Sequence, residues 1–489
     1  MKFDEICVVG GGSAGWMTAA LLVQHFKGNK RITVVESPNI GTVGVGESTT
    51  QHFSTFKRFL GLDDSEWMPA CDATYKNSIR FEDWGEEKPF HYPFGEYDTN
   101  LTHVEWWWWR AKNQIDSQSF QTTFSNAASV SEAGKLYLPY VESDDIGYHF
   151  DATKMANYLR DKYCLLRGVN HISATVQEID VEGGNIKSLH LDTGEVIGAD
   201  LFIDCTGFRA ILMNKLHVPW ESWNNILHND STWAIRKPYK NKREELTAYT
   251  RVSAMPNGWA WTVPTYERIG TGYNYSSKHC SKLDALIDFK HFLGMEDVSD
   301  REFRHLSWPT GIRKKIWSGN CVAIGLSAGF IEPLESGGLY SVHEFLFHLI
   351  QFIDSDTKKL NGMMRDFFNE ACRDQFTAFR DFVASHYTLA KKDDTKYWDF
   401  VTNIEHRPVP GLFPQNMQSI DKLYDSYAYL LGGMRYNLIG PRELMDNPFD
   451  TGYISDIIST RLRETQDAID NNPVPLDYYK STLYKEQLS

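Results

Sequence analysis

The chain has 489 residues, which is enough for one large domain or two interlocked ones that bury a cofactor. It carries 64 acidic and 50 basic residues, a net charge of -14, with no long Lys/Arg run, which argues against nucleic acid and an anionic membrane surface as partners. The seven cysteines are widely spaced without a Cys-x-x-Cys pair, and neither a signal peptide nor a bilayer-length apolar run is evident, so we expect a soluble, cytoplasmic protein.

The chain begins with a predicted strand, a glycine turn and a helix. An apolar strand at residues 6–9 precedes GGGSAG at residues 10–15, a helix follows over residues 16–26, and a second strand at 32–35 ends at Glu36. This order is typical of a βαβ unit that binds a dinucleotide: the glycines allow the pyrophosphate to approach, the helix N-terminus attracts its charge, and the acid binds a ribose. The predicted cofactor-binding residues here are Gly10, Gly12, Ser13, Ala14, Gly15 and Glu36.

The fingerprint alone does not separate NAD from FAD, but three features favour FAD. No second glycine fingerprint offers a site for NADPH. Residues 199–207 look like the second flavin motif of glutathione-reductase-like hydroxylases, an apolar strand that ends in glycine. Residues 319–325 predict a buried strand that opens into a turn of small residues. We therefore predict FAD as the cofactor, with contacts from Asp204, Gly207 and Gly325.

Further along the chain, we expect a helix over residues 152–167 and strands at 171–180 and 186–193, joined through Gly183-Gly184-Asn185. Residues 81–150 are rich in aromatic residues, include four consecutive tryptophans at 106–109, and are predicted to form a substrate-facing insertion. The remaining pattern is helical, over residues 339–352, 363–386, 419–431 and 451–470.

These elements predict an α/β fold. Residues 1–340 would form a box-like FAD-binding domain with mixed sheets, related to the glutathione-reductase and hydroxylase folds. Residues 341–489 would form a mainly helical, pyramid-like part that packs on it and covers the substrate.

Eight motifs follow one another in a fixed order. They are GGGSAGW at 10–16, GVGEST at 44–49, Tyr75-Lys76 before an Arg-Phe-x-x-Trp run, HFDA at 149–152, LFIDCTG at 201–207, GWAWTVP at 258–264, IEPLESGG at 331–338, and His386-Tyr387 followed by Asp394-Thr395-x-Tyr397-Trp398. In this order they resemble the flavin-dependent halogenases of the tryptophan-halogenase type, and the resemblance runs over most of the chain.

The resemblance implies a two-component enzyme that receives FADH2 from a separate flavin reductase. In that family reduced FAD and O2 oxidise a halide ion, chloride, bromide or iodide, to hypohalous acid, which crosses an internal tunnel to a small aromatic substrate. Lys76 resembles the catalytic lysine that delivers the halogen, and Glu335 its carboxylate partner that accepts the proton lost from the ring. Read without the resemblance, Lys76 would be an ordinary surface lysine.

Trp259 and Trp261 resemble tunnel residues that keep the substrate away from the flavin. On a strand the two indoles would lie on the same face, although pairs at this spacing are more often packing residues. The stretch 41–50 resembles the strap that joins the flavin site to the substrate site, and its predicted cofactor contacts are Gly46, Glu47 and Ser48.

The resemblance also implies a halide site built from backbone N–H groups of Ser336, Gly337 and Gly338. The family often has Thr at the position of Gly337, so this glycine is a departure that would loosen or enlarge the site. An alternative is an ordinary helix start without a ligand.

Substrate recognition follows the family less closely. Members that act on free tryptophan hold the indole between a histidine and a phenylalanine; here Phe94 matches the phenylalanine, whereas Tyr92 stands at the histidine position. Free tryptophan is therefore doubtful, and another electron-rich arene, indole-like or phenol-like, is favoured.

Two other functions stay open from the sequence. One is a flavin-dependent aromatic hydroxylase that inserts oxygen directly, and the other is a flavin-binding protein without turnover. No metal site is expected, because His343 and His348 stand five residues apart rather than the four that zinc binding on one helix face needs. The sequence leaves a homo-oligomer open.

Overall fold

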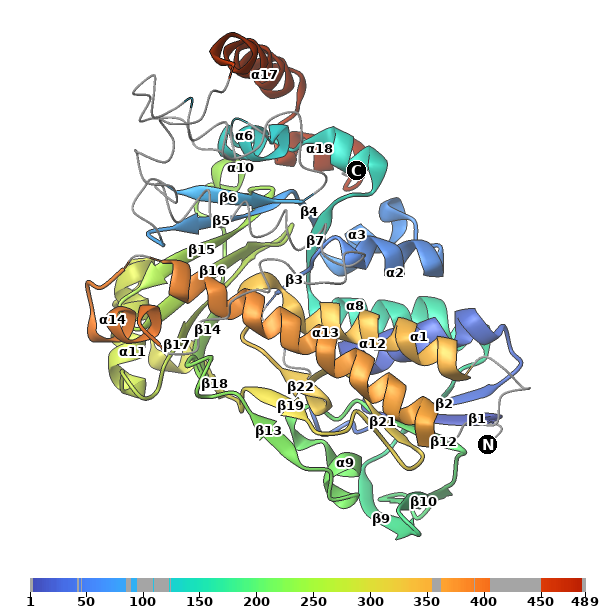
Figure 1. Cartoon of the computed structure of the whole chain (residues 1–489). Helices are drawn as coiled ribbons and strands as arrows, with labels where there is room; N and C mark the ends of the chain where they lie inside the picture. The colour runs from blue at the N-terminus through green and yellow to red at the C-terminus, as the bar shows by residue number, and fades with distance from the viewer. Residues whose placement is uncertain are drawn as a thin grey trace. The chain divides into compact units, whose positions relative to one another are not determined.

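The computed structural model describes residues 3–41, 44, 46–84, 89–94, 109, 123, 125–353, 362–390, 392–404 and 450–485 (Figure 1). The chain forms two compact units, each assembled from three stretches of sequence. The first unit comprises Met1–Ala73, Phe150–Asp230 and Ser307–Arg380, and the second comprises Thr74–His149, Ser231–Leu306 and Asp381–Ser489. The expected division into residues 1–340 and 341–489 stays a prediction.

A six-stranded sheet forms the core of the first unit. Its order is β20-β21-β12-β1-β2-β8, and all neighbours are parallel except β20, which pairs antiparallel with β21. The central strands read as continuous apolar runs, as expected when helices cover both faces of a parallel sheet. The strands are β1 (Glu5–Val9), β2 (Arg31–Glu36), β8 (Asn170–Ser173), β12 (Leu201–Asp204), β20 (Trp317–Ser318) and β21 (Cys321–Ala323).

The other elements of the first unit surround this sheet. Helix α1 packs on β1 and β2 and against α8 and α12, and two further three-stranded sheets have the orders β11-β10-β9 and β13-β19-β22. The helices are α1 (Ser13–Phe26), α2 (His52–Leu60), α3 (Asp64–Cys71), α8 (Ala152–Tyr158), α9 (Ile211–Lys215) and α12 (Gly337–Ile353). The further strands are β3 (Glu47–Ser48), β9 (Val176–Glu182), β10 (Asn185–Leu191), β11 (Val196–Ile197), β13 (Trp220–Ser222), β19 (Gly311–Arg313) and β22 (Gly329–Phe330).

A seven-stranded sheet organises the second unit, in the order β18-β14-β17-β16-β15-β5-β6. Strands β5 and β15 are parallel, whereas β5 pairs antiparallel with β6, β15 with β16, β16 with β17, and β14 with β17. The strands are β5 (Ser78–Glu82), β6 (Phe90–Pro93), β14 (Ser231–Lys237), β15 (Tyr249–Met255), β16 (Gly258–Pro264), β17 (Ile269–Tyr275) and β18 (Arg304–Ser307). A separate antiparallel pair joins β4 (Thr74–Lys76) to β7 (Gly147–Phe150).

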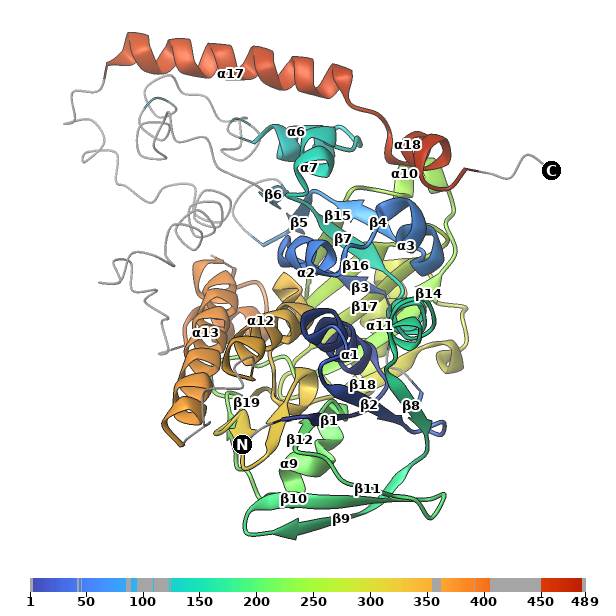
Figure 2. The same ribbon diagram turned by 90° about the vertical axis from the view of Figure 1, so that its right-hand side faces the viewer.

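Helices of the second unit line this sheet (Figure 2). Helix α11 packs on β14 and β17, α6 packs on β5 and β6, and α17 packs on α6. The helices are α6 (Asn126–Glu132), α7 (Leu138–Ser143), α10 (Lys242–Glu245), α11 (Lys282–Leu293), α14 (Lys396–Thr402), α17 (Thr451–Asn471) and α18 (Pro475–Thr482). Helix α13 (Gly362–Leu389) contributes residues to both units.

Helix boundaries follow the expected capping chemistry. The side chains of Asp63, Asp151 and Ser281 accept hydrogen bonds from backbone N–H groups in the first turns of α3, α8 and α11. Gly61 and Gly294 end α2 and α11 in the left-handed region, at φ values of 68° and 60°.

Several sequence predictions are confirmed by these boundaries. The βαβ unit is present as β1, α1 and β2, and the hairpin across Gly183-Gly184 as β9 and β10. The strand predicted at 171–180 is instead two strands, because β8 pairs with β2 in the main sheet before β9 enters the hairpin. The helices predicted at 339–352, 363–386 and 451–470 are present as α12, α13 and α17. The helix predicted over 152–167 is also helical throughout, but residues Leu159–Cys164 form a π-helix and Leu165–Arg167 a 3-10 turn. The helix predicted at 419–431 and three of the four tryptophans at 106–109 lie outside the described residues. Within the described part of the chain, no helix is both long and apolar enough to cross a membrane.

Candidate active site

The glycine turn between β1 and α1 has the shape that a dinucleotide pyrophosphate requires. A Cβ at Gly10 would lie 2.3 Å from the backbone oxygen of Cys205, and a Cβ at Gly15 would lie 1.8 Å from the backbone oxygen of Gly10, so both positions exclude a side chain. A Cβ at Gly12 would meet no heavy atom of the described residues within 4 Å. The backbone therefore packs tightly on one side and leaves the N-terminus of α1 accessible to an anion on the other.

Glu36, at the end of β2, lies beside this turn. A Cβ at Gly11 would lie 2.0 Å from Cδ of Glu36, so the carboxylate stands directly against the glycine backbone. The Nε2 atom of His171 lies 3.1 Å from Oε2 of Glu36, and the ring of Trp16 packs edge-on against His171. This position suits an acid that binds an adenosine ribose, so the residues present fit an FAD adenosine and pyrophosphate.

Two later motifs converge on the same region of the first unit. Gly325 has a φ of 72°, and a Cβ there would lie 2.9 Å from Cβ of Ala14 in the first turn of α1. The Ser13 hydroxyl donates to the backbone oxygen of Ala152, 3.3 Å away. The predicted contact residues Ser13, Ala14 and Gly325 are thus gathered at one end of the sheet, where α/β folds bind ligands.

Asp204, predicted as a cofactor contact, also accepts hydrogen bonds from the helix and the turn that follow it. One carboxylate oxygen accepts from the N–H groups of Leu212 and Met213, at 2.9 and 3.0 Å, and so caps α9. The other accepts from the backbone and hydroxyl of Thr206, at 3.0 and 2.6 Å. Burial raises the pKa of Asp204, and these hydrogen bonds oppose the rise. The bonds fix the turn into Gly207, which has a φ of 65°.

Glu47 and Ser48 form β3 in the strap. Burial, and secondarily the charge of Asp151, raises the pKa of Glu47 to about 7. Its carboxyl group therefore changes charge close to neutral pH. Gly46, just before it, has a φ of 113°, a backbone conformation that favours glycine.

Ser48 connects the strap to the predicted halide residues. Its hydroxyl oxygen accepts from the hydroxyl of Ser336 at 3.1 Å, and Ser336 itself adopts a left-handed backbone with φ of 59°. Helix α12 begins at the next residue, Gly337, and its first turn carries no acidic side chain. Glu335 is buried at the end of the preceding 3-10 turn, Pro333–Glu335. The predicted halide residues therefore stand at a helix N-terminus that attracts negative charge.

An aromatic ring occupies the space beside Gly337. A Cβ at Gly337 would lie 2.2 Å from Cε1 of Phe379 on α13, whereas a Cβ at Gly338 would meet no described heavy atom within 4 Å. Phe379 stacks on Tyr340 of α12, with ring centroids 5.3 Å apart. Gly337 therefore leaves no void on the side that faces α13, because the Phe379 ring fills the space that a side chain would occupy.

Lys76 is fully buried at the end of β4 in the second unit. Its Nζ atom lies 5.0 Å from the ring centroid of Phe94, the residue that was predicted to contact the substrate. The backbone N–H of Phe94 donates to Asn77 O at 2.9 Å, and the N–H of Asn77 donates to Ala248 O at 2.7 Å. The lysine strand is thereby tied to β15 and to the end of β6.

His149 lies opposite Thr74 across the β4–β7 pair. Its Nδ1 atom is 3.2 Å from the Thr74 hydroxyl, which itself donates to Pro264 O at 2.7 Å, so the imidazole Nδ1–H is the donor to Thr74. Its Nε2 atom then accepts from the Thr250 hydroxyl at 2.8 Å. Burial and the nearby charge of Lys76 hold the pKa of His149 well below its usual range, so the ring beside the lysine is neutral.

Trp259 and Trp261 lie on β16 with ring centroids 6.1 Å apart. This confirms that the two indoles share one face of a strand. A Cβ at Gly272 on the neighbouring β17 would lie 2.0 Å from Cη2 of Trp261, so that glycine makes room for the indole. Both indoles are buried, and their role along a tunnel stays a prediction.

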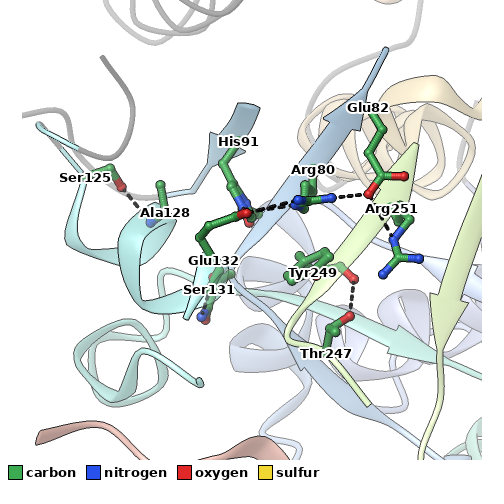
Figure 3. A network of polar contacts seen from close by, with 12 residues as sticks. Arg80, Glu82, His91, Ser125, Ala128, Ser131, Glu132, Thr247, Tyr249 and Arg251 are labelled. Atoms are coloured by element: carbon green, nitrogen blue, oxygen red, sulfur yellow. Dashed lines mark hydrogen bonds and ion pairs between the residues drawn. The ribbon is translucent and has the colours of Figure 1, made fainter. Parts of the chain in front are cut away.

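Tyr92 lies on β6 opposite Ile79, and its ring centroid is 6.0 Å from that of Phe382. Beside it a polar network fastens α6 to the sheet edge (Figure 3). Nε and Nη2 of Arg80 donate to the two oxygens of Glu132 at 2.8 and 3.0 Å, and His91 Nε2 lies 2.7 Å from Oε2 of Glu132.

These contacts set the charges in the network. Burial would raise the pKa of Glu132, but the hydrogen bonds from His91 and Arg80 outweigh it and hold that pKa below its usual range. Burial lowers the pKa of His91. The Ser78 hydroxyl lies 2.8 Å from the remaining His91 nitrogen, so the imidazole is held on both sides. The network was not anticipated from the sequence, since Glu132 lies 52 residues from Arg80 and 41 residues from His91 along the chain.

The structure thus gathers the predicted residues into two groups. The cofactor and halide residues, together with Glu335, belong to the first unit. Lys76, Phe94, Tyr92 and the tryptophan pair belong to the second. The pairing of Lys76 with Glu335 stays a prediction. Sequence reasoning missed Phe379, and it noted His149 only as part of the HFDA motif.

The sequence pattern of the tryptophan halogenase family matches residues 5–422 of the chain. The tryptophan 6-halogenase SttH of Streptomyces toxytricini is 36% identical over 451 residues, which cover 85% of this chain and 83% of the relative. Among solved structures, a tryptophan C-6 flavin-dependent halogenase (chlorinase) from taromycin biosynthesis has a TM-score of 0.87 at 29% identity and covers 98% of this chain and 100% of its own. BrvH, a flavin-dependent halogenase from Brevundimonas sp. BAL3, has a TM-score of 0.84 at 28% identity, with 99% of each chain covered.

Proposed function

This chain belongs to the tryptophan halogenase family, and on that premise we propose that it halogenates an electron-rich aromatic substrate with FADH2, O2 and a halide ion. Bound reduced FAD would activate O2, and O2 would be the oxidant that converts halide to hypohalous acid, with oxidised FAD and water as the other products. The net change replaces an aromatic C–H bond by a carbon–halogen bond, and the ring proton leaves with the hydroxyl group of the hypohalous acid as water. FADH2 would come from a separate flavin reductase.

The single observation that carries the proposal is the burial of Lys76. A lysine ammonium is almost never fully buried unless it is paired, because removing its charge from water is costly, so the full burial of Lys76 indicates that the surrounding residues are arranged to accommodate its amine. Lys76 follows Tyr75 in one of the motifs shared with the family, and Phe94 presents an aromatic face 5.0 Å from its amine. We assign to Lys76 the delivery of the halogen from hypohalous acid to the ring.

Glu335 would accept the proton that the ring loses, since a buried carboxylate beside the reacting carbon can act as a general base. The N–H groups of Gly337 and Gly338, at the start of α12, would hold the halide. Gly10, Gly12, Ala14, Glu36 and Gly325 would hold the FAD, as their geometry supports.

The substrate is proposed as an indole-like or phenol-like arene. SttH is named for tryptophan, whereas the name of BrvH specifies only a flavin-dependent halogenase. Tyr92 takes the place of a histidine that free-tryptophan enzymes use, which favours an arene other than free tryptophan. Because residues 405–449 lie outside the described part of the chain, the substrate panel has to include tryptophan itself.

The test is aerobic turnover with a flavin reductase, one halide at a time, and a panel of tryptophan, simple indoles and phenols, read by mass spectrometry. Halogenated product that requires the halide supports the proposal, and Glu335→Gln should reduce it strongly while flavin oxidation continues. Hydroxylated product formed equally without halide would instead identify a flavin hydroxylase. FAD binding without any product on the panel would point to a flavin-binding protein.

A further inference from the structure

The C-terminal helix α18 reaches the strand that carries Lys76 (Figure 2). The hydroxyl oxygen of Tyr479, on α18, accepts a hydrogen bond from the backbone N–H of Tyr75 at 2.7 Å, across 404 residues of sequence. Tyr75 immediately precedes Lys76 in β4, and the side chain of Tyr479 is fully buried. A residue near the end of the chain is therefore one peptide unit away from the proposed catalytic lysine.

The Tyr75 amide needs this acceptor because β4 lies at the edge of its sheet. On one side β4 pairs with β7, which brings Tyr75 opposite Tyr148. The N–H of Tyr75 is instead bonded to the Tyr479 phenol, and Tyr75 is buried from water. A buried backbone N–H without an acceptor is strongly unfavourable, so removal of the phenol oxygen would disturb the strand at this point.

The backbone on the other side of Lys76 has its own restraints. Asn77 donates its N–H to Ala248 O at 2.7 Å and accepts at its carbonyl from the N–H of Phe94 at 2.9 Å. Lys76 is thus held between a C-terminal tyrosine before it and the main sheet after it. Its Nζ atom lies 5.0 Å from the ring centroid of Phe94.

Helix α18 is fastened so that Tyr479 can act as a rigid support. The ring of Tyr479 stacks on Tyr75 at 6.0 Å between centroids and contacts Tyr266 edge-on at 6.3 Å. At the start of the helix, Asp477 receives a two-pronged ion pair from Arg243, with distances of 2.6 and 2.8 Å. The pair is exposed and adds little energy by itself, but it fixes the helix orientation.

Helix α18 lies outside the segment that the family sequence pattern covers. That pattern ends at residue 422, whereas α18 spans Pro475–Thr482.

We propose that Tyr479 is a positioning residue for Lys76: its hydroxyl holds the Tyr75 amide and so fixes the strand from which the lysine delivers the halogen. The inference rests on the proposed function of Lys76. Tyr479 touches neither substrate nor flavin in this role. Its loss should misplace the lysine without changing how hypohalous acid is made.

The experiment compares Tyr479→Phe with Tyr478→Phe in the full-length, FAD-loaded enzyme. Tyr478 precedes Tyr479 on the same helix and its ring also packs near Tyr75, so its substitution removes a hydroxyl while the Tyr479–Tyr75 bond remains. For Tyr479→Phe we expect the yield of halogenated product per FADH2 oxidised to fall by about fivefold or more. The KM for the arene should stay within about twofold of the wild-type value, because a misplaced lysine lowers reactivity more than substrate binding. Tyr478→Phe should keep the wild-type ratio.

A second readout does not depend on turnover. Hydrogen exchange followed by mass spectrometry should show faster exchange, by about tenfold, at the Tyr75 amide in Tyr479→Phe and not in Tyr478→Phe, because that amide loses its acceptor. If Tyr479→Phe does not fold, hydrogen exchange of the wild-type enzyme decides the matter: slow exchange of the Tyr75 amide supports the bond to Tyr479, and exchange as fast as that of an exposed amide overturns the inference.

The outcomes separate the two proposals. If wild type forms no halogenated product, the proposed function fails. If wild type halogenates and Tyr479→Phe keeps the wild-type product ratio, the positioning inference is wrong while the function stands. Equal losses in Tyr479→Phe and Tyr478→Phe would also overturn it, because they would indicate general loosening of the helix.

Discussion

Replacing Glu47 by Gln should make the protein more stable above neutral pH and leave it unchanged at acidic pH. Burial, assisted by the charge of Asp151, raises the pKa of Glu47 from 4.5 to about 7, so ionisation is harder in the folded than in the unfolded chain. As pH rises from 4.5 through 7, the unfolded chain releases this proton first, and the folded state loses stability over that window. Gln cannot ionise, and the variant escapes this loss.

The magnitude follows from the two pKa values. The difference between 4.5 and about 7 corresponds to about 3 kcal/mol, at roughly 1.36 kcal/mol for each pH unit. Because Glu47 is only partly shielded from solvent, this value is an upper limit. At pH 8 the variant should melt up to roughly 3 °C above wild type, because a chain of 489 residues shifts by about 1 °C for each kcal/mol, and at pH 4 the two should coincide.

The assay is thermal unfolding of the flavin-free protein at pH 4, 6 and 8, followed by circular dichroism, so that cofactor binding does not contribute. Glu66→Gln is the matched control, since Glu66 is an exposed carboxylate near the start of α3. If Glu47→Gln shows the same difference from wild type at all three pH values, the reasoning about a buried carboxyl group in the strap is refuted.

Three further predictions concern packing and charge. Gly337→Thr should destabilise the protein by about 1–3 kcal/mol, because its Cβ would lie 2.2 Å from the Phe379 ring, and Phe379→Ala should recover part of the loss in a double-mutant cycle of melting temperatures. Gly272→Ala should likewise lower the melting temperature and shift tryptophan emission by displacing the Trp261 indole, which would lie 2.0 Å from the new Cβ; unchanged emission would contradict this. Glu132→Gln should lower the melting temperature at pH 7, and the deficit should shrink progressively as pH falls below about 4.5, because the unfolded wild-type chain then takes up a proton that the folded carboxylate, whose pKa is lowered by its partners, does not; a deficit independent of pH would argue against the ion-paired network.

The sequence was most informative where local pattern determines local structure. The glycine turn, its flanking strands and Glu36 follow from spacing alone, and the structure brings Glu36 to the backbone of Gly11 as that motif requires. The shared face of Trp259 and Trp261 follows from the two-residue period of a strand. These features need no knowledge of distant contacts.

The features that escaped prediction depend on residues far apart in the chain. Nothing in the sequence near Gly337 indicates that Phe379 fills the adjacent space, and nothing near Tyr75 indicates Tyr479 as its acceptor. The network of Arg80, His91 and Glu132 likewise forms only when α6 packs on the sheet edge. Local propensity cannot anticipate such contacts, because tertiary packing decides them.

The most direct measurement of the central claim is a single turnover with bromide. Wild type and Lys76→Met, each loaded with FADH2, are mixed with oxygenated buffer containing bromide and an indole, and the product is examined for the bromine isotope doublet. Lys237→Met, which removes a lysine from the same unit without a proposed role, is the control. We expect brominated indole from wild type and the control and none from Lys76→Met, with flavin oxidation complete in all three. Equal bromination by Lys76→Met, or an oxygenated product without bromine from wild type, would contradict the account.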